Sequence, residues 1–293
     1  MTFVSSSRRY RPQTFAEVLD QPVSVRILQN AILQNRIANA YCFSGQRGTG
    51  KTTLARLLAK TLNCDDLERQ KQAGLKPEPC NKCTSCVNVT AGKDLNVLEI
   101  DASSNRGIDN AKQISGVANQ QPPPGKWTVI ILDEAHGLTK DAQNALLALF
   151  ETPPSAFLPI LCTTEIDKIL PTILSRCSQF TIRSLSINAI SDNLQRIFND
   201  AKVSVTPGAL FSIARIGNGS LRDVQQIADQ VVNSVFSNET VDEAFLESVI
   251  GIPTSISYRK VAGALNDAWI DGPAIWFEMC EDFAQKGADF SQL

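Results

Sequence analysis

The sequence predicts an α/β fold, with helices on both faces of a parallel sheet, followed by a smaller part made of helices. Short aliphatic runs alternate with helical patterns up to about residue 180, and this alternation is typical of parallel sheets. Beyond that point the strand signals fade and apolar residues recur every three or four positions, which indicates helices. A hydrophobic content of 43% and a charged content of 20% are typical of a folded globular chain.

Each expected element follows from its local pattern. Apolar runs bounded by turn or polar residues predict strands at 40–44, 97–101, 128–133 and 157–163. Helical periodicity predicts helices at 51–62, 108–119 and 140–151, and further helices at 188–202, 207–216 and 220–232. Pro207 suits a first helical turn, and Gly217-Asn218-Gly219 breaks the chain before Ser220, a residue type that caps helices.

Length and charge restrict the function. A chain of 293 residues is expected to hold two or three domains. The net charge of −2 lacks the basic surplus of a free-standing nucleic-acid binder, so any DNA binding must be local or depend on partners. The longest aliphatic run, at 129–132, is too short to span a membrane, and the N-terminus shows no secretory signal. We therefore expect a cytoplasmic protein without a membrane partner.

A phosphate-binding motif follows the first expected strand. Its eight residues match the pattern G-x-x-x-x-G-K-S/T: Gly45, Gln46, Arg47, Gly48, Thr49, Gly50, Lys51 and Thr52. In such a loop the backbone N–H groups and the start of the next helix face the phosphates. Lys51 is expected to reach the β and γ oxygens, and the Thr52 hydroxyl to bind Mg²⁺. A plain glycine-rich turn is the alternative, which the strand before and the helix after the motif disfavour.

Two acids end the expected strand at 128–133. Asp133 would hold Mg²⁺, and Glu134 would orient and deprotonate an attacking water, which predicts hydrolysis. Solvated acids at an ordinary strand end are the alternative, which is weaker beside a phosphate loop. His136 is the single histidine of the chain, and we interpret it as structural.

Four of the eight cysteines have the spacing of a metal site. Cys80, Cys83 and Cys86 are separated by two residues each, and Cys64 lies upstream, which predicts a tetrahedral Zn²⁺ site. An iron–sulfur site or a redox pair is the alternative, but the further x-x-x-C-P of the ferredoxin run is missing. The other cysteines, which lie in or beside apolar runs, are interpreted as ordinary core residues: Cys42, Cys162, Cys177 and Cys280.

The order of these motifs resembles the gamma/tau subunits of bacterial DNA polymerase III, members of the AAA+ ATPase class. The segments that carry the resemblance, over about residues 8 to 250, are Arg9–Val18, the phosphate loop, the four-cysteine insertion, Leu132–His136, Leu161–Glu165, Ile173–Cys177 and Gly219–Asp223. The resemblance implies that the chain is the ATPase motor that loads the sliding clamp onto primed DNA. Its cofactors would be ATP, Mg²⁺ and Zn²⁺.

The resemblance also implies site residues and partners. Thr164 matches the sensor-1 residue, Arg176 the arginine finger that reaches the ATP of a neighbouring subunit, and Arg222 the sensor-2 arginine. Arg11 and Val18 would line the adenine side of the pocket. The partners would be other clamp-loader subunits, the sliding clamp and primer–template DNA. Without the surrounding motifs, Arg176 and Arg222 would be interpreted as surface arginines.

The implied domains are an AAA+ nucleotide-binding domain at 1–179 with a zinc module at 64–86, a helical lid at 180–241, and the start of a helical collar at 242–293. Three departures accompany the resemblance. The segment between Cys64 and Cys80 is longer than the family leads us to expect, and Ala135 stands where the family often has valine. The chain also ends early in the expected collar, before any tau-type tail.

Two other functions fit part of the sequence. Asp133-Glu134-Ala135-His136 is also the acidic box of a helicase superfamily, but a helicase would need a second ATPase domain, which the helices after about residue 180 do not provide. A scaffold that binds zinc and does not hydrolyse nucleotide is the other alternative, and the intact Lys51, Thr52, Asp133 and Glu134 argue against it.

Overall fold

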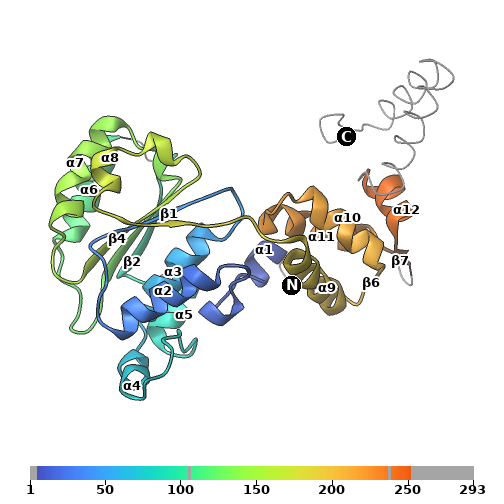
Figure 1. Ribbon diagram of the computed structural model, residues 1–293, viewed down its shortest axis with the longest axis horizontal. Coiled ribbons are helices and arrows are strands. Elements are labelled where there is room, and N and C mark those ends of the chain that lie inside the picture. The colour runs from blue at the N-terminus through green and yellow to red at the C-terminus, as the bar shows by residue number, and fades with distance from the viewer. Residues whose placement is uncertain (1–4, 105–106, 237–238, 252–293) are drawn as a thin grey trace. The chain divides into compact units, whose positions relative to one another are not determined.

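The computed structural model describes residues 5–104, 107–236 and 239–251 (Figure 1). The chain divides into two compact units. One unit comprises residues 11–184, and the other combines residues 1–10 with residues 185–293. The part of the expected collar at 252–293 lies outside the described residues.

The first unit is built on a five-stranded parallel sheet with the strand order β2-β3-β4-β1-β5. Its strands are β1 (Tyr41–Ser44), β2 (Val97–Asp101), β3 (Thr128–Asp133), β4 (Phe157–Thr163) and β5 (Ser178–Thr181). The predicted parallel sheet is thus confirmed. β5 was not predicted as a strand, because only Phe180 among its four residues is buried and no aliphatic run marks it.

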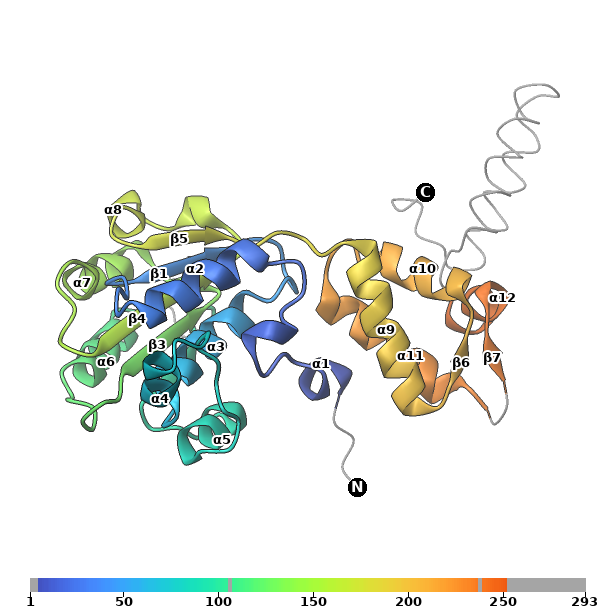
Figure 2. The ribbon, with the colours of Figure 1, turned by 60° about the horizontal axis from the view of Figure 1, so that its bottom comes forward.

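Helices cover both faces of this sheet (Figure 2). The helices of the unit are α2 (Pro22–Leu33), α3 (Lys51–Leu62), α4 (Leu67–Gln72), α5 (Thr84–Ala91), α6 (Ile108–Ala118), α7 (Lys140–Glu151) and α8 (Pro171–Leu174), with short 3-10 turns at Phe15–Glu17, Ala135–Gly137 and Ile166–Lys168. Side chains of β3 alternate between the two faces. Ile131 packs with α2 and α3 in one core cluster, and Ile130 packs with α6 and α7 in the other.

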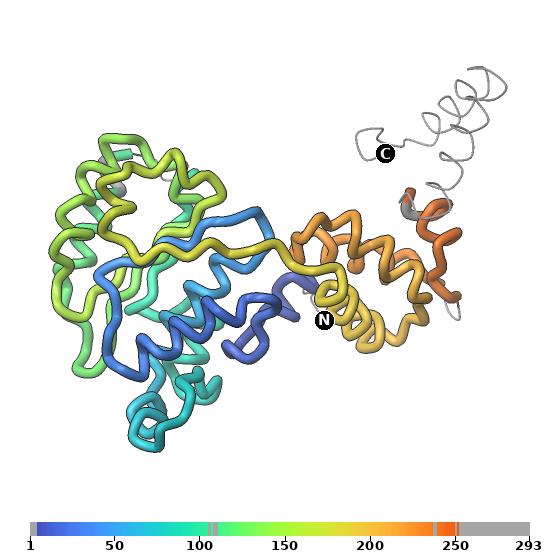
Figure 3. Tube along the Cα trace, in the orientation of Figure 1, coloured from blue at the N-terminus to red at the C-terminus, as the bar shows by residue number. Residues whose placement is uncertain are grey.

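The second unit is mainly helical, and its path can be followed in Figure 3. It contains α1 (Ser6–Arg9), α9 (Ile187–Ala201), α10 (Pro207–Ile216), α11 (Leu221–Ser234), α12 (Glu243–Phe245) and a final turn at Leu246–Ile250, with the short parallel strands β6 (Ser204–Val205) and β7 (Thr240–Val241). As predicted, Pro207 occupies the first turn of α10 and Ser220 caps α11 by accepting the Asp223 N–H.

The N-terminal helix α1 is fastened to this helical unit. The Ser6 backbone N–H donates to Asp229 Oδ2 of α11 at 2.9 Å, and the Tyr10 hydroxyl donates to Asp200 Oδ2 of α9 at the same distance. Residues 5–10 therefore pack with a segment about two hundred positions away in the chain. Among the described residues, no helix is long and apolar enough to cross a membrane.

Candidate functional site

The phosphate loop connects β1 to α3 at the carboxyl edge of the sheet. Gly45 has φ +146°, and a Cβ there would lie 2.3 Å from the carbonyl oxygen of Ile182. Gly50, just before α3, has φ +102° with open space around it. The first glycine is thus required by close packing as well as by backbone conformation, the second by conformation alone.

Lys51 lies folded against its own loop. Its Nζ donates to the carbonyl oxygens of Gly45 at 3.0 Å and Gln46 at 2.9 Å, and only 6% of the residue is exposed. Burial lowers the pKa of Lys51, while the nearby acids act in the opposite direction. A buried ammonium beside a curled loop at a helix start is the arrangement that binds phosphate oxygens.

Two predicted Mg²⁺ ligands meet across the sheet edge. Thr52, in the first turn of α3, donates its hydroxyl to Asp133 Oδ2 at 3.0 Å. Asp133 is the last residue of β3, and burial raises the pKa of its carboxyl group. A half-buried carboxylate with a hydroxyl beside it is a set of oxygen ligands, which is what Mg²⁺ prefers.

Glu134 follows at once, in the left-handed region with φ +48°. Its Oε2 atom is buried without a hydrogen-bond partner. The ring of His136 lies beside it, with Nδ1 3.6 Å from this oxygen and 3.1 Å from the hydroxyl of Thr163. Nε2 of the ring lies 3.4 Å from Glu165 Oε1. These contacts join the residues after β3 to the end of β4.

The sequence did not predict this cluster around His136. The hydroxyl that contacts His136 belongs to Thr163, the last residue of β4, and the residue expected as sensor 1 is its neighbour Thr164. Thr164 follows it in a half-buried position. The one sequence feature that could have indicated this cluster is the position of His136, two residues after Glu134.

Arg176 and Arg222, the two arginines expected to act on nucleotide, lie far from the phosphate loop in the sequence. Arg176 follows α8 and is exposed, and its guanidinium pairs with Glu151 of α7 and donates to the Thr172 carbonyl at 2.6 Å. Arg222 is exposed in the first turn of α11, in the helical unit. Both side chains are therefore accessible to a partner.

The two residues expected at the adenine also lie in the α/β unit. Arg11 lines a cleft together with Thr53 and Lys60 of α3 and Thr90 of α5. Val18 packs against the core cluster that contains α2 and α3.

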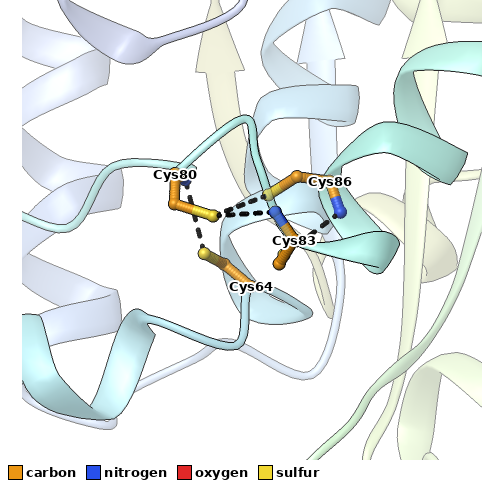
Figure 4. A group of neighbouring side chains, drawn as sticks. All are labelled: Cys64, Cys80, Cys83 and Cys86. Carbon is orange, nitrogen blue, oxygen red and sulfur yellow. Dashed lines mark hydrogen bonds between the residues drawn. The ribbon is translucent and has the colours of Figure 1, made fainter.

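The four predicted cysteines come together. All four Sγ atoms lie within 4.8 Å of one another (Figure 4). Sulfurs bound to one tetrahedral Zn²⁺ would be about 3.8 Å apart, given Zn–S bonds of about 2.3 Å. Backbone N–H groups point at the sulfurs, because Cys83 N donates to Cys80 Sγ at 3.3 Å and Cys86 N to Cys83 Sγ at 3.4 Å. The residues thus fit a closed metal site.

The electrostatics of the cluster favour thiolate at one position. A hydrogen bond from Cys86 lowers the pKa of Cys64 to about 5, and the same interaction raises the pKa of Cys86. The thiolate form is the one that binds metal. The hydrogen bonds within the cluster therefore favour the metal-binding form at Cys64.

The cysteine module is bonded to the rest of the unit. Glu78 accepts the N–H groups of Phe15 at 2.6 Å and Ala16 at 3.1 Å, and its own backbone is held by Gln70. The Gln70 side chain donates to Glu78 O at 2.9 Å and accepts from Glu78 N at 2.8 Å. This reciprocal pair closes the segment between α4 and Cys80.

Known proteins resemble this chain in sequence and in fold. The family model described as "DNA polymerase III, delta subunit" matches residues 20–186. The tau subunit of DNA polymerase III from Bacillus subtilis is 35% identical over 293 residues, which are 100% of this chain and 50% of that protein. The gamma subunit from Buchnera aphidicola subsp. Schizaphis graminum is 33% identical, with 86% of this chain and 67% of that protein covered.

The solved structures agree with the fold. The Thermotoga maritima RuvB Holliday junction branch migration motor superposes with a TM-score of 0.55 at 16% identity, covering 85% of this chain and 71% of that one. At that identity the likeness establishes the α/β fold alone. The chain spans about half the length of the Bacillus subtilis relative and 35% of the Escherichia coli tau subunit, to which it is 38% identical. On the sequence matches, the chain belongs to the gamma/tau family of DNA polymerase III subunits.

Proposed function

We propose that this chain is an ATPase subunit of the bacterial DNA polymerase III clamp loader, which uses ATP to load the sliding clamp onto primed DNA. One observation supports the chemistry most directly. The phosphate-loop hydroxyl of Thr52 meets the Asp133 carboxylate at 3.0 Å, and Glu134 is the next residue. This is the set of groups that phosphoryl transfer to water requires.

In this mechanism the loop amides and Lys51 hold the β and γ phosphates. Lys51 must exchange its bonds to the Gly45 and Gln46 carbonyls for phosphate oxygens when ATP binds. Mg²⁺, held by Thr52 and Asp133, would neutralise charge on the phosphates. Glu134 orients the attacking water and takes its proton.

The remaining contacts to nucleotide follow the family pattern. Thr164 is proposed to sense the γ-phosphate, and Arg222 to couple nucleotide to the angle of the helical part. Arg11 and Val18 are proposed to contact the adenine. The loop residues that would surround the phosphates are Gly45, Gln46, Arg47, Gly48, Thr49 and Gly50. On the same pattern we propose an AAA+ domain at 1–179, a lid at 180–241 and the start of a collar at 242–293.

Arg176 is proposed to act on the ATP of an adjacent subunit. Its exposure supports this, and its pairing with Glu151 is a surface ion pair that costs little free energy to exchange for a phosphate. An arginine supplied in trans can raise the rate of phosphoryl transfer by about 10³–10⁵. Hydrolysis would then occur only in the assembled ring of clamp-loader subunits.

The cysteine module is proposed to bind Zn²⁺ through Cys64, Cys80, Cys83 and Cys86 in a structural role. The convergence of four sulfurs and the N–H groups directed at them support this assignment. A closed site of this kind contributes to folding rather than to catalysis. DNA and the clamp would be bound by the ring as a whole, in the cytoplasm, which is compatible with the net charge of −2.

The test is the ATPase rate of the full-length chain in the reconstituted clamp-loader complex, with clamp and primed DNA present. Arg176→Ala and Glu134→Gln should each lower the stimulated rate by at least tenfold. Arg69→Ala is the matched control, because Arg69 is also exposed and paired with a carboxylate, that of Asp66 at 2.5 Å. An unchanged rate in Arg176→Ala would exclude the role in trans, and an unchanged rate in Glu134→Gln would exclude hydrolysis at this site.

A further inference from the structure

The imidazole of His136 lies between two carboxylates that come from neighbouring strands. Nδ1 is 3.6 Å from Glu134 Oε2, just after β3, and Nε2 is 3.4 Å from Glu165 Oε1, just after β4. The ring side chain is 18% exposed. Both ring nitrogens thus face acidic groups, and the ring bridges the ends of two adjacent strands.

Glu134 needs such a neighbour. Its Oε2 atom is buried without a hydrogen-bond partner, although 37% of the side chain is exposed. A buried carboxylate oxygen without a donor is unfavourable, and the backbone of Glu134 is also in the left-handed region at φ +48°. Small rotations of the two side chains would close the 3.6 Å gap from Nδ1 to a hydrogen bond, without any change of the backbone.

His136 is itself held in place. Nδ1 lies 3.1 Å from the hydroxyl of Thr163, which is fully buried and accepts the N–H of Glu165 at 3.0 Å. The carboxylate of Glu165 pairs in turn with Lys168 Nζ at 2.7 Å. Partners on both nitrogens fix the plane of an imidazole and therefore the direction in which it presents Nδ1.

We propose that His136 is a positioning residue for Glu134. In this role the N–H at Nδ1 donates to Oε2 of the carboxylate, so that Oε1 is the oxygen presented to the attacking water. The Thr163 hydroxyl is a second acceptor beside the same N–H, and the contact with Glu165 restricts the rotation of the ring. The inference rests on the proposed function, since it assigns a role in the hydrolysis carried out through Glu134. It goes beyond our interpretation of His136 as structural.

Replacing His136 by asparagine or by glutamine distinguishes a positioning role from simple packing. The amide of asparagine can replace Nδ1 of histidine, and the amide of glutamine can replace Nε2. His136→Phe removes both polar atoms and should lower kcat by about ten- to a hundredfold, as small displacements of a catalytic group do, with KM and ATP affinity unchanged. His136→Asn should restore most of the rate, and His136→Gln should restore little.

The assay is steady-state ATPase of the full-length chain in its reconstituted complex, with ATP affinity and the melting temperature measured for each variant. Asp167→Asn, an exposed acid on the same turn after β4, is the matched control and should keep the normal kcat. Glu165→Gln should lower kcat less than His136→Phe does. If His136→Phe does not fold, the comparison of kcat between His136→Asn and His136→Gln still separates a positioning role from a packing role.

Three outcomes would overturn the inference. A normal kcat in His136→Phe, beside a loss of turnover in Glu134→Gln, would remove the positioning role and leave the proposed function intact. Equal losses in His136→Asn and His136→Gln that follow the melting temperature would reduce His136 to a packing residue. Full turnover in Glu134→Gln would remove the proposed function, and the role of His136 with it.

Discussion

Replacing Gly45 by alanine should destabilise the α/β unit more than the same change at Gly50. Both glycines have positive φ, at +146° and +102°, so a side chain at either position costs about 1–3 kcal/mol in backbone strain. At Gly45 the new Cβ would also lie 2.3 Å from the carbonyl oxygen of Ile182, whereas at Gly50 it would meet nothing within 4 Å. Overpacking of this kind adds about 1–3 kcal/mol, so we expect about 2–6 kcal/mol for Gly45→Ala.

The assay is urea unfolding followed by circular dichroism, without nucleotide, so that loss of binding does not enter the comparison. The chain has two units, and the unfolding transition that shifts should be that of the α/β unit. Gly50→Ala is the matched control because it shares the conformational cost and lacks the contact. Equal losses of unfolding free energy in the two variants would refute the reasoning from the close contact.

Three further changes have defined outcomes. Cys86→Ser should lower the zinc content of the purified chain, measured by elemental analysis, because Cys86 is fully buried among the other sulfurs. Burial raises the pKa of Asp133, so the native state binds the proton of this carboxyl group more tightly than the unfolded state does. The free energy of unfolding therefore falls as the pH rises from the unfolded-state pKa of Asp133 through its raised native-state pKa. Asp133→Asn should therefore raise the urea midpoint of the nucleotide-free chain at neutral pH. The difference in urea midpoint between the variant and the unchanged chain should become smaller at acidic pH, and a difference that stays the same would refute this prediction. Gly217→Ala would place a Cβ 2.0 Å from Val224 Cγ1 and should destabilise the helical unit by about 1–3 kcal/mol, seen as a lower melting temperature.

Much of the fold follows from local pattern. Three of the strands with apolar runs, β1, β3 and β4, were predicted because their residues are buried on both faces, as at Ile130 and Ile131 of β3. β2 was predicted from its apolar residues, although they are only half-buried or exposed. β5 could not be predicted in this way. Among the described residues it is an edge strand paired with β1. Its alternate residues are exposed, so that Phe180 is its one strong apolar signal.

The candidate site divides in the same manner. The phosphate loop, Asp133 and the cysteine set are local patterns, and their spacing in the sequence carries the prediction. The contact of His136 with Thr163 depends on which strand lies beside β3 and on which face of β4 a side chain points to. Neighbouring residues in a strand face opposite sides, so a contact made by Thr163 could be found only once the register of β4 against β3 was known.

The reciprocal hydrogen bonds between Gln70 and Glu78 make the length of one loop independent of the site beside it. Residues 72–76 are exposed, and the segment is closed at its base before the chain reaches Cys80. Each doubling of a closed flexible loop costs only about 0.6 kcal/mol, so related chains can lengthen or shorten this tip at little cost. The same independence makes residues 72–76 a place to insert a fluorescent label that reports on the protein without disturbing its metal site.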